Sequence, residues 1–197
     1  MTVCQALLTL SKPSEYFEKY KNTETFPQLD ALVGVEQEPR FHPEGDVWNH
    51  TMLVLDRAAQ LREKAENPLA FMLSALCHDL GKVTSTAVID GRIRAFGHEE
   101  QGIAPAKKLL SIIGADEQTV DYVTNMTLLH MRPNMLVSQK SGDKAYKRLF
   151  DKSVCPNDLI LLANADHTSR PGFEDDEQFT AILFEKLNEY NKNEGSV

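Results

Sequence analysis

The sequence lacks the features that mark secreted and membrane-spanning proteins. Its three cysteines, Cys4, Cys77 and Cys155, are widely spaced and odd in number, and no Cys-x-x-Cys pair occurs. This distribution argues against a disulfide framework and against a cysteine-rich zinc site, and indicates a reduced, cytoplasmic protein. No apolar run reaches the roughly 18 residues of a membrane span, and the N-terminus lacks the basic leader of a signal peptide. We therefore expect neither secretion nor a membrane span.

Positive charge is also scarce. The chain has 21 Lys and Arg against 29 Asp and Glu, which gives a net charge of −8. Extended contact with a phosphate backbone favours a basic face, so broad nucleic-acid binding is not expected as the main role, although a local basic pocket is compatible. The 197 residues, 42% of them apolar, suffice for one domain with a full core.

Hydrophobic periodicity predicts an almost entirely helical chain. The expected helices cover residues 15–21, 26–33, 46–66, 68–81, 98–113, 116–131, 141–151, 156–166 and 174–191. Asp46 is expected to cap one helix, Gly81 and Gly114 to end two others, and Arg132–Pro133 to end a fourth. Residues 84–96 favour a loop or a small hairpin. We expect an all-α bundle forming a single domain over residues 1–197, with a helical extension at residues 1–40 and a frayed tail at residues 193–197.

The dipeptide His78–Asp79 is the most informative feature that is present. It ends an apolar run that begins at Leu69 and is followed by Leu80, Gly81 and Lys82. Buried imidazole and carboxylate groups are costly to desolvate unless they are paired or bind a cation. A metal site explains both the residue types and their position.

Other histidines and one aspartate stand near the expected ends of further helices, where side chains can converge in the core of a bundle. These residues are His50, His98, His130 and Asp166. Imidazole and carboxylate ligands suit Mn, Fe, Co, Ni or Zn. Because no cysteine is among them, the pattern favours an open site for hydrolytic chemistry over a closed structural one. His42 and His167 are interpreted as ordinary polar residues.

The order His50, His78–Asp79, Asp166 resembles the H…HD…D pattern of the HD-domain metal-dependent phosphohydrolases. Further segments resemble the HD domain of bacterial CCA-adding enzymes, and together they span roughly residues 12–173: residues 26–51, 76–82, 97–98, 147–151, 165–166 and 170–173. CCA-adding enzymes also carry a nucleotidyltransferase head, and nothing in this chain resembles it. We therefore expect no nucleotide addition, and expect the hydrolytic activity of that family.

The resemblance implies a ligand set and a substrate class. It implies that His50, His78, Asp79 and Asp166 bind a first divalent transition metal. His98 and His130 are in the right order to bind a second ion bridged by Asp79; the alternative is substrate contact or acid catalysis at a site with one metal. The implied substrates are nucleotides and similar phosphoesters, including 2′,3′-cyclic nucleotides and 2′-nucleotides.

Several basic and aromatic residues are candidates for substrate binding, each with a simpler alternative. Lys82 can bind phosphate, or be a solvated lysine that stabilises a helix C-terminus. Arg170 can bind phosphate through paired hydrogen bonds, or form a salt bridge with the acidic run at residues 174–177. The cluster formed by Lys144, Lys147 and Arg148 can bind a nucleotide or an RNA 3′ end, or be a solvated helix face. Phe41 and Trp48 can stack on a base or pack in the core.

Two other classes of function stay open. The domain can be a non-catalytic nucleotide-binding or accessory module for a tRNA nucleotidyltransferase, or a structural domain stabilised by its metal. A substrate screen with several metals separates the phosphohydrolase from both. The sequence gives no indication of the oligomeric state.

Overall fold

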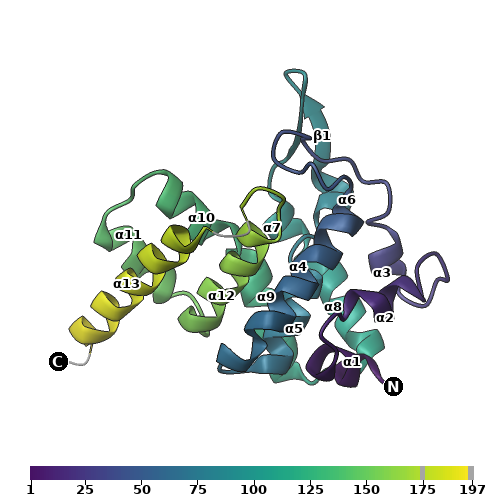
Figure 1. The fold of residues 1–197 in the computed structure, drawn as a ribbon, viewed down its shortest axis with the longest axis horizontal. Coiled ribbons are helices and arrows are strands. Elements are labelled where there is room, and N and C mark those ends of the chain that lie inside the picture. The colour runs from purple at the N-terminus through teal and green to yellow at the C-terminus, as the bar shows by residue number, and fades with distance from the viewer. Residues whose placement is uncertain (174–175, 195–197) are drawn as a thin grey trace.

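Helices form the body of the molecule and one hairpin projects from it (Figure 1). The computed structural model describes residues 1–173 and 176–194. The first elements are α1 (Val3–Thr9), α2 (Ser14–Glu18), α3 (Pro27–Asp30), α4 (Val47–Leu61), the 3₁₀ turn η1 (Arg62–Lys64), α5 (Pro68–Cys77), α6 (Lys82–Ser85), β1 (Thr86–Ile89) and β2 (Arg92–Ala95). The remaining helices are α7 (His98–Gln101), α8 (Ile103–Ile113), α9 (Glu117–Leu129), α10 (Met131–Ser138), α11 (Asp143–Phe150), α12 (Pro156–Thr168) and α13 (Glu177–Glu194). The predicted helical bundle is confirmed, as is the small hairpin, in which Thr86 pairs with Ala95.

The core lies where α4, α5, α9 and α12 pack together in the centre of the molecule (Figure 1). Residues 70–77 of α5 are all buried, so this helix is surrounded on every side. The N-terminal helices α1, α2 and α3 contact α5, α4 and α8 respectively. The central position of α5 places its C-terminal end, and the dipeptide that follows it, inside the protein.

Local capping sets the start of α4 and α5. The Asp46 carboxylate accepts a hydrogen bond from the Asn49 backbone N–H at 2.9 Å, as expected for a helix cap. Asn67 caps α5 with Pro68 as its first residue. Gly114 ends α8 at a φ of 82°, a conformation that glycine adopts without strain. The predicted boundaries at these positions are confirmed, and the first fixes His50 near the start of α4.

The prediction that Gly81 ends the helix of residues 68–81 is wrong. α5 ends at Cys77, and Gly81 has an ordinary right-handed φ of −72°. Its role is close packing, because a Cβ at this position would lie 1.9 Å from the His98 carbonyl oxygen and 2.5 Å from the Gly102 backbone nitrogen. Gly81 thus allows α7, which begins at His98, to approach the His78–Asp79 segment.

Several other boundaries differ from the prediction. The helix expected over residues 46–66 ends at Leu61 and continues as the 3₁₀ turn η1. The helix expected over residues 98–113 is divided at Gly102 into α7 and α8. Pro133 does not end the helical path, because it lies in the first turn of α10, where no intrahelical N–H donor is required. As a result α10 continues past His130 and contacts α12 and α13.

None of the helices in the described part of the chain has both the length and the apolar character that crossing a bilayer requires. Cys4, Cys77 and Cys155 are free thiols.

Candidate metal centre

The six predicted ligand side chains come together in the protein interior. They come from α4, the turn after α5, the start of α7, the α9–α10 junction and α12. Their residues are between 1% and 8% exposed: His50, His78, Asp79, His98, His130 and Asp166. Elements far apart in the sequence thus contribute to one buried cluster, as expected for polar side chains at helix ends in the core of a bundle.

Asp79 lies in the middle of this cluster and divides it in two. Its Oδ2 is 3.2 Å from His78 Nε2 and 3.6 Å from His50 Nε2. Its Oδ1 is 3.4 Å from His98 Nε2 and 3.7 Å from His130 Nε2. We call His50, His78 and Asp166 with Asp79 Oδ2 the first half of the centre, and His98 and His130 with Asp79 Oδ1 the second half.

The Nδ1 atom of each of the four imidazoles lies within hydrogen-bond distance of an oxygen. These contacts are His50 to Glu44 Oε1 at 2.8 Å, His78 to the Ala75 carbonyl at 2.8 Å, His98 to the Ala95 carbonyl at 2.7 Å and His130 to the Thr127 carbonyl at 2.6 Å. Carbonyl and ionised carboxylate oxygens only accept hydrogen bonds, so each Nδ1 carries the proton. In the neutral imidazoles the Nε2 lone pairs therefore face the centre, the arrangement that a metal ligand requires.

The protein alone provides few hydrogen-bond partners for the Nε2 atoms. His98 Nε2 and His130 Nε2 face each other at 3.2 Å, which opposes two lone pairs when both rings are neutral. Within the described residues, His78 Nε2 is buried and makes no hydrogen bond. A cation between the groups removes both problems. The residues present therefore fit a divalent transition metal, and the mixed nitrogen and oxygen donors match the expected ions.

The two carboxylates of the centre are held in their ionised form. Burial opposes ionisation of Asp79, but the neighbouring His78 and Lys82 outweigh it and hold the pKa well below its ordinary value. Burial likewise opposes ionisation of Asp166, whose pKa is lowered by the neighbouring His50 and by the charge of Arg170. Both groups are thus available as anionic ligands.

Glu44 is a residue that the sequence analysis did not identify. Its Oε1 accepts from His50 Nδ1 at 2.8 Å and from His42 Nδ1 at 2.9 Å, and its side chain is only 3% exposed. Burial opposes ionisation of Glu44, but these two hydrogen bonds lower its pKa. The residue lies in the irregular loop before α4, where no periodicity points to a role. Its proximity to His50 depends on the loop conformation.

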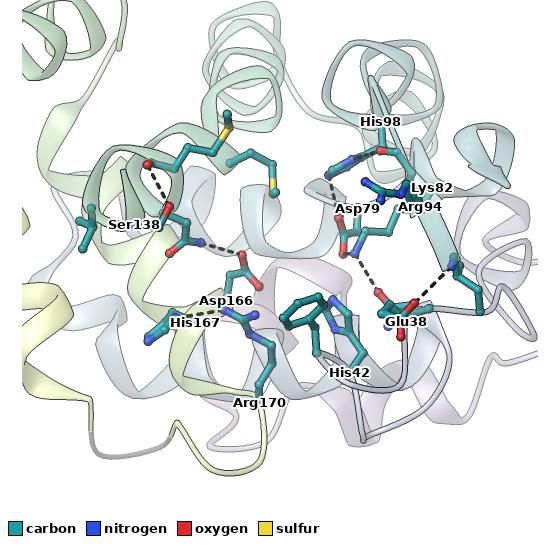
Figure 2. A pocket seen from close by; sticks show the side chains of 18 of the residues that line it. Glu38, His42, Asp79, Lys82, Arg94, His98, Ser138, Asp166, His167 and Arg170 are labelled. Atoms are coloured by element: carbon teal, nitrogen blue, oxygen red, sulfur yellow. Dashed lines mark hydrogen bonds and ion pairs between the residues drawn. The ribbon is translucent and has the colours of Figure 1, made fainter. Parts of the chain in front are cut away.

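A cavity of about 860 Å³ opens onto the centre. Asp79, His98 and Asp166 contribute to its wall. Figure 2 shows Lys82, Arg94 and His98 on one side of it, and Asp166, His167 and Arg170 on the other. A volume of this size is typical of pockets for small molecules such as a nucleotide.

Two of the predicted phosphate-binding residues line this cavity. Lys82 Nζ lies 2.8 Å from Asp79 Oδ2 and donates to Gln37 Oε1 at 2.8 Å. The Arg170 guanidinium donates to His167 Nδ1 at 3.0 Å, and His167 in turn contacts Asp176 at 2.8 Å. Of the acidic run proposed as a partner of Arg170, residues 174–175 lie outside the described residues.

The other substrate-binding candidates lie elsewhere. Lys144, Lys147 and Arg148 are exposed on α11 and do not belong to the cavity wall, and Lys147 pairs with Asp151 at 3.1 Å. Phe41 lines the cavity and is 52% exposed.

Trp48 does not accompany Phe41 in the cavity wall. It is 1% exposed and its indole N–H donates to Glu18 at 2.7 Å, so it is a core residue. Base stacking by the pair of aromatic residues is therefore not supported.

Residues 47–170 match the family model of the HD domain, and this segment contains every predicted metal ligand. The chain belongs to the HD-domain family. HD domains bind divalent metals and support metal-dependent phosphohydrolase chemistry, which agrees with the clustered ligands.

Curated relatives carry the name multifunctional CCA protein. The protein of Actinobacillus pleuropneumoniae serotype 5b is 31% identical over 192 residues, covering 91% of this chain and 45% of its own length. That of Mannheimia succiniciproducens is 33% identical, with 76% and 36% covered, and that of Pasteurella multocida is 30% identical, with 82% and 40% covered. The chain thus spans less than half the length of these relatives.

Proposed function

We propose that this HD-domain protein hydrolyses nucleotides or nucleotide-like phosphoesters, as a 2′,3′-cyclic phosphodiesterase, 2′-nucleotidase or phosphatase. The observation that carries the proposal is the joining of two histidine–carboxylate clusters through Asp79 at the wall of a nucleotide-sized cavity. A divalent metal held there lowers the pKa of a water nucleophile and neutralises charge on the phosphoryl oxygens.

We assign the first half, with His50, His78, Asp79 and Asp166, to one ion, and the second half, with His98 and His130, to another. Asp79 supplies one carboxylate oxygen to each half. His98 is the histidine of the second half that lines the cavity, whereas His130 lies behind it at 1% exposure. His98 is therefore the one placed to contact substrate or protonate a leaving oxygen when the second half holds no ion.

Lys82 and Arg170 bind the phosphoryl group in this proposal. Both line the cavity beside the carboxylates of the centre, Lys82 next to Asp79 and Arg170 near Asp166 (Figure 2). Among the described residues, the buried Nε of Arg170 has no hydrogen-bond partner. An anion in the cavity supplies that partner, and guanidinium groups bind phosphate through paired hydrogen bonds.

The relatives' names suggest a role connected with RNA 3′ ends. We propose that an RNA 3′ end enters the cavity while Lys147 and Arg148 contact the RNA outside it. We further propose that the protein acts in the cytoplasm and that the residues of this chain do not add nucleotides. Their exposed position on α11 supports electrostatic contact with a longer substrate only, because they do not line the cavity.

A metal-dependent substrate screen tests the proposed function. Protein stripped of metal by chelation is incubated with adenosine 2′,3′-cyclic phosphate, adenosine 2′-phosphate or p-nitrophenyl phosphate, and Mn²⁺, Co²⁺, Ni²⁺, Zn²⁺ or Mg²⁺ is then added. We expect product only after a transition metal is added. Turnover by the metal-free protein contradicts the proposal. Nucleotide binding without turnover under every condition supports the accessory module instead.

A further inference from the structure

Asn134 on α10 makes an unusual pair of contacts beside the metal centre. Its side-chain nitrogen donates to Asp166 Oδ2 at 3.3 Å. Its side-chain oxygen is buried and has no hydrogen-bond partner among the described residues. An unpaired buried acceptor is unfavourable, and one in a native structure calls for a partner that the protein itself does not supply.

The contact with Asp166 fixes which way the amide faces. A carboxylate that serves as a metal ligand only accepts hydrogen bonds, so the NH₂ group of Asn134 faces Asp166 Oδ2 and the amide oxygen faces elsewhere. Asn134 belongs to the wall of the cavity. Its oxygen is thus an oriented acceptor for a hydrogen-bond donor on a bound molecule. The nitrogen of the same amide group contacts Asp166, a predicted metal ligand.

The surroundings of Asn134 fit the nucleoside part of a substrate. Met131, Met135 and Ser138 follow one another along α10 at intervals of four and three residues, so they share one face of the helix, and all three line the cavity together with Asn134. The apolar Ile182 of α13 also belongs to this wall. Figure 2 places Ser138 and Asp166 at the same end of the cavity. Apolar walls with a few oriented polar groups are typical of small-molecule sites.

We propose that Asn134 Oδ1 accepts a hydrogen bond from the hydroxyl next to the scissile phosphoester, so that the enzyme selects ribonucleotides over their deoxy counterparts. This inference rests on the proposed function. The donor must lie close to the phosphate, because Asn134 is bound to a residue of the metal centre. In a nucleoside phosphate the vicinal ribose hydroxyl is such a donor, whereas the amino groups of the base are many bonds away.

The test compares pairs of substrates that differ only in this hydroxyl. Adenosine 3′-phosphate is compared with 2′-deoxyadenosine 3′-phosphate, and adenosine 2′-phosphate with 3′-deoxyadenosine 2′-phosphate. The kcat/KM ratio within each pair is measured for the wild type, for Asn134→Ala and for the control Gln139→Ala, whose side chain is exposed and lies outside the cavity wall. Loss of the Asp166 contact affects both members of a pair equally, so the ratio isolates the acceptor.

For whichever of the two pairs is hydrolysed faster, we expect the wild type and Gln139→Ala to prefer the substrate that carries the hydroxyl by about tenfold, the net effect of one hydrogen bond. In Asn134→Ala the ratio should fall to about one. A wild-type ratio near one, or a ratio that Asn134→Ala leaves unchanged, overturns the inference.

If no nucleotide is hydrolysed, the proposed function fails, and the same pairs are then compared as ligands by calorimetry with Mn²⁺ present. An affinity ratio that Asn134→Ala abolishes supports recognition of the hydroxyl at a binding site. Equal affinities, or no binding of either nucleotide, overturn it.

Discussion

The two halves of the metal centre differ in how the protein holds them. In the first half, two carboxylates, Asp79 and Asp166, face two imidazoles, and a third carboxylate, Glu44, fixes the orientation of His50. In the second half a single carboxylate oxygen faces His98 and His130, and backbone carbonyls orient both rings.

This difference indicates different affinities for metal. More anionic ligands stabilise a divalent cation more strongly, and a carboxylate bonded to a ligand histidine raises its basicity. We therefore expect the first half to bind its ion more tightly. The second half includes His98, which lines the cavity, and its fewer protein ligands leave positions for substrate.

Asp79→Ala has the largest expected effect because it removes the one residue that the halves share. We expect metal binding to be strongly reduced in both halves and kcat/KM to fall by about 1,000-fold or more, since several kcal/mol of transition-state stabilisation depend on the metal. Metal analysis and phosphate release measure the two effects. The exposed Asp121→Ala is the matched control. Full activity in Asp79→Ala excludes the proposed centre.

Glu44→Ala should weaken the first half selectively. It removes the acceptor that holds His50, and loss of such a supporting group lowers metal affinity by about 10- to 100-fold. Calorimetric titration with Mn²⁺ measures this loss for the tighter ion. Glu44→Gln should recover part of the affinity, because its amide oxygen still accepts a hydrogen bond but carries no charge. Glu185→Ala serves as control, because Glu185 is exposed and lies outside the cavity wall. Unchanged affinity in Glu44→Ala refutes the assigned role.

Gly81→Ala should disturb the second half through its backbone. The added methyl group meets the His98 carbonyl, so α7 must shift and its histidine with it. We expect a loss of about 1–3 kcal/mol in the free energy of unfolding, the usual cost of overpacking, and weaker binding of the second ion. Thermal unfolding with and without metal tests this. Gly142→Ala is the control, because nothing lies within 4 Å of its Cβ. Equal behaviour of the two variants argues against the packing role of Gly81.

The sequence predicted the helical bundle and the clustering of the ligand residues because both depend on strong local signals. Apolar periodicity identifies α4 and continuous apolar runs identify α5 and α12, and the caps at Asp46 and Asn67 fix the starts of α4 and α5. His78–Asp79 stands out because two costly polar residues follow an apolar helix. The resemblance to the HD domain then assigned the partners that spacing alone left open.

Other features depend on tertiary contacts that sequence patterns do not show. Gly81 looks like a helix stop, but its lack of a side chain serves the approach of α7. Pro133 looks like a helix end, but falls in a first turn that tolerates it. The roles of Glu44 and Asn134 cannot be predicted from the sequence, because they depend on how the loop before α4 and one face of α10 fold against the metal centre.

Metal stoichiometry tests the central claim, that Asp79 joins two ion sites, most directly. Metal-free wild-type protein and the His130→Ala variant are titrated with Mn²⁺ or Co²⁺, and the bound ions are counted per chain. We predict two ions for the wild type, with the weaker one absent in His130→Ala. A single ion in the wild type at saturation, bound equally well by His130→Ala, would contradict the account.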